Sequence, residues 1–271
     1  MDEDRVATMI TARGCPWHCA FCAPAERLHF GGVRRRSVAS ALEELRWIDS
    51  QWGPFGAVSF HDSLFFQGRR WAEEFLERYP RETPCWPFFG TARANQILRW
   101  PDLFNALIKE ANWRSLAIGY ESGSDRMLKA MRKQCSVEDN MAVIDMVNTV
   151  GDQLLASGKK PLRCYAYMML GVPGEEPEDV FMSLRMVVHM RHTIPRFSYY
   201  TPYPGSMWGD EMKAQNSILN LGYDYDRFPD RPKVAGVDYD FYRRLMAGYY
   251  DREVGYPVAA LLGRQGTRDY G

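Results

Sequence analysis

Residues 13–22 read Arg-Gly-Cys-Pro-Trp-His-Cys-Ala-Phe-Cys and place three cysteines, Cys15, Cys19 and Cys22, close together on the chain. Structural disulfides would need an even number of cysteines, and a closed tetrahedral metal site would need a fourth ligand nearby. Three thiolates on a cluster of four irons leave one iron open, and an open iron can bind a small molecule and pass it an electron. The C-x3-C-x2-C spacing therefore favours a catalytic iron–sulfur centre.

The triplet resembles the cluster-binding loop of the radical S-adenosylmethionine superfamily, which also has an aromatic residue, here Phe21, before its third cysteine. The resemblance implies a 4Fe-4S cluster on the three cysteines and S-adenosylmethionine on the open iron. It also implies reductive cleavage of S-adenosylmethionine to a 5′-deoxyadenosyl radical. The alternative is a zinc site that adds His18 or His29 to two or three of the cysteines, although zinc ligands usually come in paired C-x2-C spacings.

The composition is that of an ordinary globular protein. A chain of 271 residues with 46% hydrophobic content can bury a sizeable core. Lys plus Arg and Asp plus Glu number 34 each, so no net charge attracts nucleic acid or a membrane surface. The sequence shows no signal peptide and no apolar run near the roughly 20 residues that span a bilayer. These features and the oxygen sensitivity of an open cluster predict a cytoplasmic protein.

Short apolar segments alternate with helical stripes along most of the chain. The expected strands are residues 6–11, 57–60, 86–90, 115–120, 162–170 and 197–201. About six strand–helix units predict a parallel sheet with helices outside it, and six units are too few to close an eight-stranded barrel. The predicted fold is therefore α/β, an open partial (β/α)6 barrel. The cysteine loop follows the first strand, at the edge where ligands bind in such folds.

The last part of the chain changes character, because no strand–helix repeat continues beyond about residue 205. We expect residues 1–205 to form the radical S-adenosylmethionine core domain. Residues 206–271 are expected to form a mainly helical C-terminal extension that packs on the barrel or caps it. An apolar stripe at helical spacing between residues 239 and 249 predicts one helix in this extension.

Two polar residues follow the second and third predicted strands. Residues 60–65, Phe-His-Asp-Ser-Leu-Phe, resemble a superfamily stretch that contacts the methionyl amine of S-adenosylmethionine, which implies a charge-assisted contact by Asp62. In the same family region after the third strand, Arg93 is expected to grip the methionyl carboxylate. The alternatives are a turn or cap role for Asp62 and a structural ion pair for Arg93.

Two further segments match at later strand ends. Residues 118–128, Ile-Gly-Tyr-Glu-Ser-Gly-Ser-Asp-Arg-Met-Leu, resemble a segment of cobalamin-binding members. This implies a cofactor contact by Glu121 and, for Ser122, either a ribose hydrogen bond or a helix N-cap. The later stretch Gly-Val-Pro-Gly-Glu resembles the turn whose backbone lies against the adenine, which implicates Gly171 and Pro173.

The motifs are most similar to the radical domain of cobalamin-binding members, whose cobalamin domain is not visible before Cys15. Cobalamin is therefore expected only in trans, on a separate subunit. The resemblance implies an external electron donor such as flavodoxin or ferredoxin. It also implies a small-molecule or other unidentified substrate, with methyl transfer or rearrangement among the outcomes. The alternative function is a degenerate domain that keeps its cluster and serves as a partner subunit or as a fragment of a larger cobalamin-type enzyme.

The sequence also offers a candidate lining for the substrate pocket. Four aromatic residues lie in or shortly after the last predicted strand, namely Tyr199, Tyr200, Tyr203 and Trp208. Aromatic side chains at a barrel rim either contact a ligand or pack the edge of the core, and the pattern does not separate the two.

Overall fold

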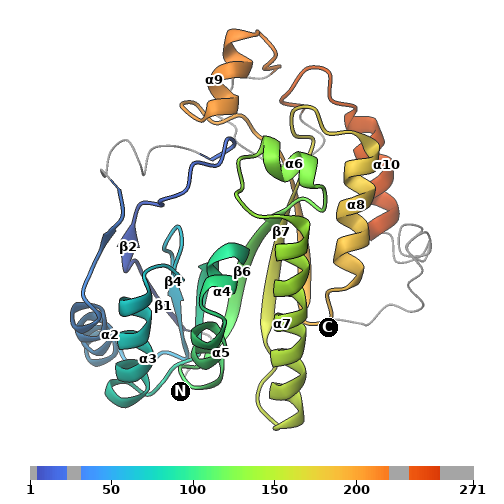
Figure 1. The fold of residues 1–271 in the computed structure, drawn as a ribbon. Helices are drawn as coiled ribbons and strands as arrows, with labels where there is room; N and C mark the ends of the chain where they lie inside the picture. Colours follow the sequence, from blue (N-terminus) through green and yellow to red (C-terminus); the bar gives the residue numbers. More distant parts are fainter. Residues whose placement is uncertain (1–4, 23–31, 220–231, 251–271) are drawn as a thin grey trace.

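The computed structural model describes residues 5–22, 32–219 and 232–250, and one six-stranded sheet forms its centre (Figure 1). The strands are β1 (Val6–Met9), β4 (Ala57–Phe60), β5 (Phe88–Ala92), β6 (Trp113–Glu121), β7 (Arg163–Leu170) and β8 (Thr193–Tyr199). They are hydrogen bonded in this order, and all five pairings are parallel. Within the described residues β1 and β8 are the free edges, which confirms the predicted open partial barrel.

Helices connect the strands and cover the outer face of the sheet (Figure 1). The described helices before residue 190 are α2 (Val38–Trp52), α3 (Arg69–Glu82), α4 (Ala94–Arg99), α5 (Pro101–Lys109), α6 (Asp125–Ala130), α7 (Val137–Ala156) and α8 (Pro177–Val188). The main core lies between these helices and the sheet and is rich in aromatic rings. Phe88 and Trp113, for example, stack with ring centroids 5.7 Å apart. The inner, concave face of the sheet carries the alternate residues of each strand.

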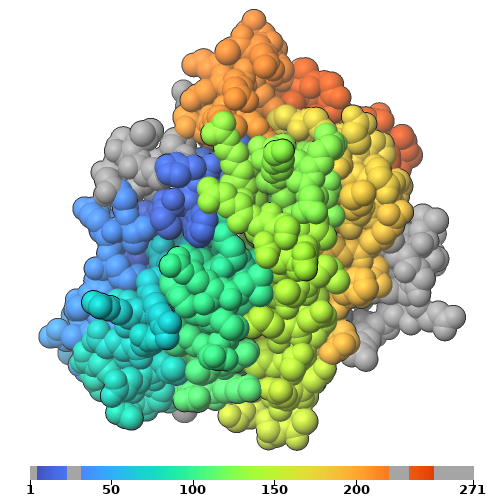
Figure 2. All heavy atoms as spheres, viewed as in Figure 1, coloured from blue at the N-terminus to red at the C-terminus, as the bar shows by residue number. Residues whose placement is uncertain are grey.

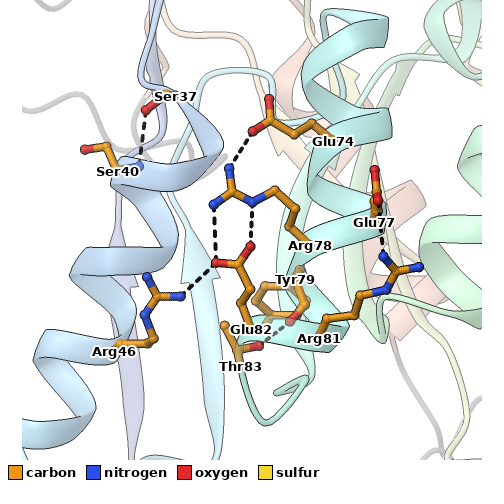
Figure 3. Close-up of polar contacts among 10 residues, drawn as sticks. All are labelled: Ser37, Ser40, Arg46, Glu74, Glu77, Arg78, Tyr79, Arg81, Glu82 and Thr83. Carbon is orange, nitrogen blue, oxygen red and sulfur yellow. Dashed lines mark hydrogen bonds and ion pairs between the residues drawn. The ribbon is translucent and has the colours of Figure 1, made fainter.

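Helices α2 and α3 pack through buried residues such as Leu45 and Phe75, while charged groups join their exposed sides (Figure 3). Arg46 of α2 donates to the Glu82 carboxylate of α3 at 2.9 Å, and Arg78 donates to the same carboxylate from one turn earlier. Exposed pairs of this kind contribute little to stability, so the apolar contacts hold this side of the molecule together.

Several expected strands have different ends in the structure. The third is Phe88–Ala92 and not 86–90, and the fourth is Trp113–Glu121 and not 115–120. The first ends at Met9 rather than Thr11, because the chain then turns into β2 (Ala12–Arg13), which pairs antiparallel with β3 (Arg34–Arg35) in a separate small sheet. The last strand is β8, Thr193–Tyr199, and not 197–201. In the sequence, Pro195 argues against a strand, because proline has no backbone N–H to donate to a neighbouring strand. Since β8 is an edge strand, the missing donor is tolerated there.

Two helices follow the sheet, α9 (Met207–Ala214) and α10 (Tyr239–Tyr250). The predicted stripe of α10 forms a helix, and its Tyr239, Tyr242 and Met246 pack against Val180 and Leu184 of α8. Helix α9 lies at the top of the molecule, next to the blue segment that carries the cysteines (Figures 1 and 2). No helix in the described ranges has the length and apolar content needed to cross a membrane.

Candidate active site

The cysteine loop lies at the carboxyl edge of the sheet and is held from two sides. The backbone N–H of Ala20 donates to the Met131 carbonyl at 2.9 Å, and the Trp208 N–H donates to the Ala20 carbonyl at 3.1 Å. Gly14 enters the loop at a φ of 91°, and a Cβ there would lie 2.3 Å from the Gly32 carbonyl oxygen. Only glycine fits this position, so the loop is fixed at its start as well as in its middle.

The three loop cysteines differ in exposure, since Cys19 is buried, Cys15 is half-buried and Cys22 is exposed. All six cysteines of the chain are described, and none forms a disulfide. The described residues contain no group of three or more His, Cys, Asp or Glu side chains already gathered as ligands of one metal ion. Three thiols on one short loop nevertheless match the ligand type and number of an iron–sulfur cluster with an open iron. His18 is exposed, and His29 lies outside the described residues.

Asp62 is buried at the end of β4 and accepts hydrogen bonds from the chain that leads into the loop. Its Oδ1 accepts from the backbone N–H groups of Thr11 at 2.6 Å and Ala12 at 3.0 Å, and its Oδ2 accepts from the Thr11 hydroxyl. The Arg35 guanidinium lies 3.5 Å from Oδ2. Burial lowers the pKa of Arg35 to about 10, an effect that the charge of Asp62 partly offsets. Asp62 therefore ties β1, the loop and β3 together.

Arg93, at the end of β5, lies directly beside the loop. Its Nη1 donates to the Cys19 Sγ at 3.1 Å, and its Nη2 donates to the Lys133 carbonyl. The guanidinium carbon lies 4.4 Å from the ring centroid of Trp17. A cysteine that ligates iron is a thiolate, and a guanidinium is suited to donate to it and offset its charge. Arg93 thus joins two residues of the cysteine loop to the turn after α6.

Glu121 forms a buried ion pair, with its Oε1 2.8 Å from the Lys133 Nζ. Both side chains are nearly inaccessible, at 11% and 5% exposure. The pair is set by a bulge at the end of β6, where Glu121 adopts a φ of 67°. A Cβ at Gly119 would lie 2.3 Å from the Glu121 Oε1, so glycine is needed beneath the pair. The Lys133 Nζ lies 5.9 Å from the Phe21 ring, which brings the pair next to the loop.

Ser122 is fully buried and turned toward α8. Its Oγ accepts from the Ser124 N–H at 3.1 Å and lies 3.4 Å from the Ser183 Oγ. The N-cap of α6 is Ser124, whose hydroxyl accepts from the Met127 N–H at 3.4 Å. The cap alternative considered for Ser122 is therefore wrong. Ser124 caps α6, and Ser122 lies two residues earlier, inside the turn between β6 and α6.

The Gly171 turn follows β7, with Gly171 at a φ of 65° and Pro173 partly exposed beside it. The Gly171 N–H donates to the Glu175 Oε2 at 2.8 Å, and the Tyr242 hydroxyl donates to the same oxygen at 2.6 Å. Burial raises the pKa of Glu175 to about 7. The turn is therefore tied to α10, a contact that the sequence did not reveal because the two residues are 67 positions apart.

The four aromatic residues proposed as a lining are placed mostly in packing. Tyr199 belongs to the cluster around α8 and α10, and Tyr200 and Trp208 belong to a second cluster around α6 and α9. A hollow that the described residues form lies elsewhere, on the inner face of the sheet. Its signal in the sequence is only the alternation of inward-facing and outward-facing residues along β7 and β8.

A family model described as the radical SAM superfamily matches residues 9–187, from the end of β1 into α8. This chain therefore belongs to the radical S-adenosylmethionine superfamily. An uncharacterized methyltransferase of Pyrococcus horikoshii is 24% identical over 79% of this chain and 44% of its own length.

Two solved structures share the fold. The radical S-adenosylmethionine methyltransferase TsrM of Kitasatospora setae matches with a TM-score of 0.60 and 16% identity, over 79% of this chain and 40% of that protein. The cobalamin-dependent radical enzyme OxsB matches with a TM-score of 0.53 and 19% identity, over 77% of this chain and 29% of that protein. The chain spans less than half of the length of these relatives.

Since related proteins are named as enzymes, the non-catalytic alternative is not favoured.

Proposed function

We propose that the protein binds a 4Fe-4S cluster through Cys15, Cys19 and Cys22, cleaves S-adenosylmethionine reductively, and uses the 5′-deoxyadenosyl radical to abstract hydrogen from a substrate. The observation that carries the proposal is the three-cysteine loop at the carboxyl edge of a parallel sheet, in a chain of this superfamily. When bound, the cluster would supply the electron that breaks the sulfonium bond. The protein would hold the reactants in place and keep water away.

The site residues predicted for S-adenosylmethionine stay proposals, and their positions support them to different degrees. Asp62, Arg93, Glu121 and Gly171 all lie at or directly after the carboxyl ends of β4 to β7, the edge that holds the loop. Arg93 and Glu121 also lie beside the loop itself, with Arg93 on Cys19 and Glu121 paired with a lysine that lies near Phe21. In this proposal the main role of Asp62 is to fix the position of the loop, because both of its carboxylate oxygens already accept hydrogen bonds.

The finer features of the reaction follow the relatives. Methyl transfer is the reaction class that related methyltransferases support, with cobalamin supplied by another domain or subunit and electrons by flavodoxin or ferredoxin. A reducing compartment such as the cytoplasm suits the open cluster. We keep the division between a core domain ending at residue 205 and an extension from residue 206, because α9 and α10 add helices but no strand to the sheet.

The test is an assay for 5′-deoxyadenosine. The protein is reconstituted anaerobically with iron and sulfide, reduced, and given S-adenosylmethionine, in parallel with Cys19→Ala and the matched control Cys85→Ala. Cys85 lies in the turn before β5, outside the loop. We expect product from the wild type and from Cys85→Ala, and none from Cys19→Ala. A cluster-loaded wild type that makes no 5′-deoxyadenosine would contradict the proposal.

A further inference from the structure

A hollow of about 420 Å³ opens on the inner face of the sheet. Its lining comes from β5, β7 and β8 and consists of Phe89, Tyr165, Tyr167, Arg196 and Ser198. Strand β6 runs between β5 and β7. Its Ser115 and Ala117, on the same face, pair in register with Phe89 and Tyr165 respectively. Small side chains on the middle strand and large ones on its neighbours create the space. Its volume falls in the range of pockets that bind small molecules.

The hollow is positively charged, although the whole chain is neutral. Arg196 is the one charged side chain in the lining. Its guanidinium carbon lies 5.4 Å from the ring centroid of Tyr165, and no carboxylate in the described residues forms an ion pair with it. The hydroxyl groups of Ser198, Tyr165 and Tyr167 add further donors. A guanidinium that lies over a ring, in a hollow whose lining also carries hydroxyl groups, is suited to bind a carboxylate or a phosphate.

The remaining surface of the hollow is aromatic. Phe89, Tyr165 and Tyr167 each present a ring, and Tyr167 is 45% exposed. A large ring left this open on a concave surface offers its face to a flat apolar group. The hollow thus combines one anion-binding point with a surface for a planar body.

We propose that this hollow binds the substrate, and that the substrate is a small molecule with a flat apolar body and a carboxylate or phosphate held by Arg196. The inference rests on the proposed function for the reaction that follows, but the recognition depends only on the residues of the hollow. Arg196 grips the oxyanion, while the rings of Tyr165 and Tyr167 hold the body on the inner face of the barrel, the face that the sheet curves around.

Calorimetric titration of the cluster-loaded protein with 2-naphthoate, 2-naphthyl phosphate and neutral 2-naphthol tests the inference. We expect at least one anion to bind about tenfold more tightly than the naphthol, a difference typical of one charge-assisted contact. Arg196→Gln should remove this preference, and Arg196→Lys should restore part of it. The matched control is Arg163→Gln, which removes a positive charge from the same face of the sheet, on β7 rather than β8 and outside the lining. It should change the affinities less than twofold.

Equal binding of naphthoate, naphthyl phosphate and naphthol, no binding of any, or equal effects of Arg196→Gln and Arg163→Gln would overturn the inference. Naphthoate and naphthyl phosphate distinguish the two oxyanions. If Arg196→Gln does not fold, Ser198→Ala and Tyr167→Ala probe the same hollow, and both should weaken the preferred anion. The titration needs no turnover, so anion binding without 5′-deoxyadenosine formation contradicts only the proposed function. Formation of 5′-deoxyadenosine without selective binding contradicts only this inference.

Discussion

The Tyr242 hydroxyl of α10 donates a hydrogen bond of 2.6 Å to the Glu175 carboxyl, which also accepts from the Gly171 N–H. Glu175 Oε1 is buried without a hydrogen-bond partner. A carboxyl in such surroundings disfavours its charged form, and burial raises the pKa of Glu175 from 4.5 to about 7. We therefore expect the contact between α10 and the Gly171 turn to depend on pH.

Glu175→Gln should remove a pH dependence of stability. Because the pKa of Glu175 is higher in the folded protein, its contribution is complete below about pH 4.5 and is lost as the pH rises through about 7. The shift corresponds to roughly 3 kcal/mol of unfolding free energy. We expect the stability difference between wild type and Glu175→Gln to favour wild type at pH 5 and to shrink or reverse at pH 8. A difference that does not change with pH, in paired thermal unfolding, would contradict this reading.

Arg93→Gln should make the cluster harder to reduce. Removing a positive donor from the Cys19 sulfur takes away an interaction that favours the more negative, reduced state. A tenfold fall in the equilibrium constant for one-electron reduction corresponds to a shift of about 60 mV to more negative potential. Spectroscopic redox titration measures it, with Arg99→Gln on α4 as the control, since Arg99 stacks on Trp100 away from the loop. An unchanged potential would mean that Arg93 does not act on the cluster.

Asp62→Asn separates two roles of this residue. If Asp62 fixes the loop, the variant should lose about 1–3 kcal/mol of stability and hold less iron even without S-adenosylmethionine, since an amide cannot accept all three hydrogen bonds. Iron content and thermal unfolding measure this, with Asp49→Asn on α2 as the control. Normal iron content with a raised KM for S-adenosylmethionine would instead assign Asp62 to the methionyl amine.

The Glu121–Lys133 pair should behave as a unit. Glu121→Gln or Lys133→Met leaves one buried charge uncompensated, with an expected cost of roughly 3–5 kcal/mol each. The double variant should cost much less than the sum of the two. Denaturant unfolding of all three proteins measures the coupling, and Arg78→Gln, in the exposed network of Figure 3, should have a far smaller effect. Additive losses would show that the pair is not coupled.

The sequence was sufficient to predict the fold because each unit carries a local signal. All six strands were predicted, although several ends differ by one or two residues and the last strand starts four residues earlier than expected; the two errors with a clear cause lie at Thr11 and Pro195. Both errors come from tertiary contacts, a hydrogen bond to Asp62 in one case and the freedom of an edge strand in the other. Local patterns do not include such contacts.

The site was predicted less completely. The cysteines were evident from their spacing, whereas the contact of Arg93 with Cys19 joins residues 74 positions apart. Lys133 was not predicted as a site residue, because its role depends on the bulge that turns Glu121 toward it. The hollow around Arg196 could not be predicted, because it depends on which strands neighbour β6 and on the small side chains that β6 contributes.

The most direct test of the central claim is the electron spin resonance spectrum of the reduced, reconstituted protein before and after S-adenosylmethionine is added. If three cysteines hold a four-iron cluster with one open iron, the spectrum should change on addition, because the new ligand alters that iron. Cys85→Ala should give the same change, and Cys19→Ala should give no such cluster. A four-iron spectrum that is identical with and without S-adenosylmethionine would contradict the claim that one iron is open to it.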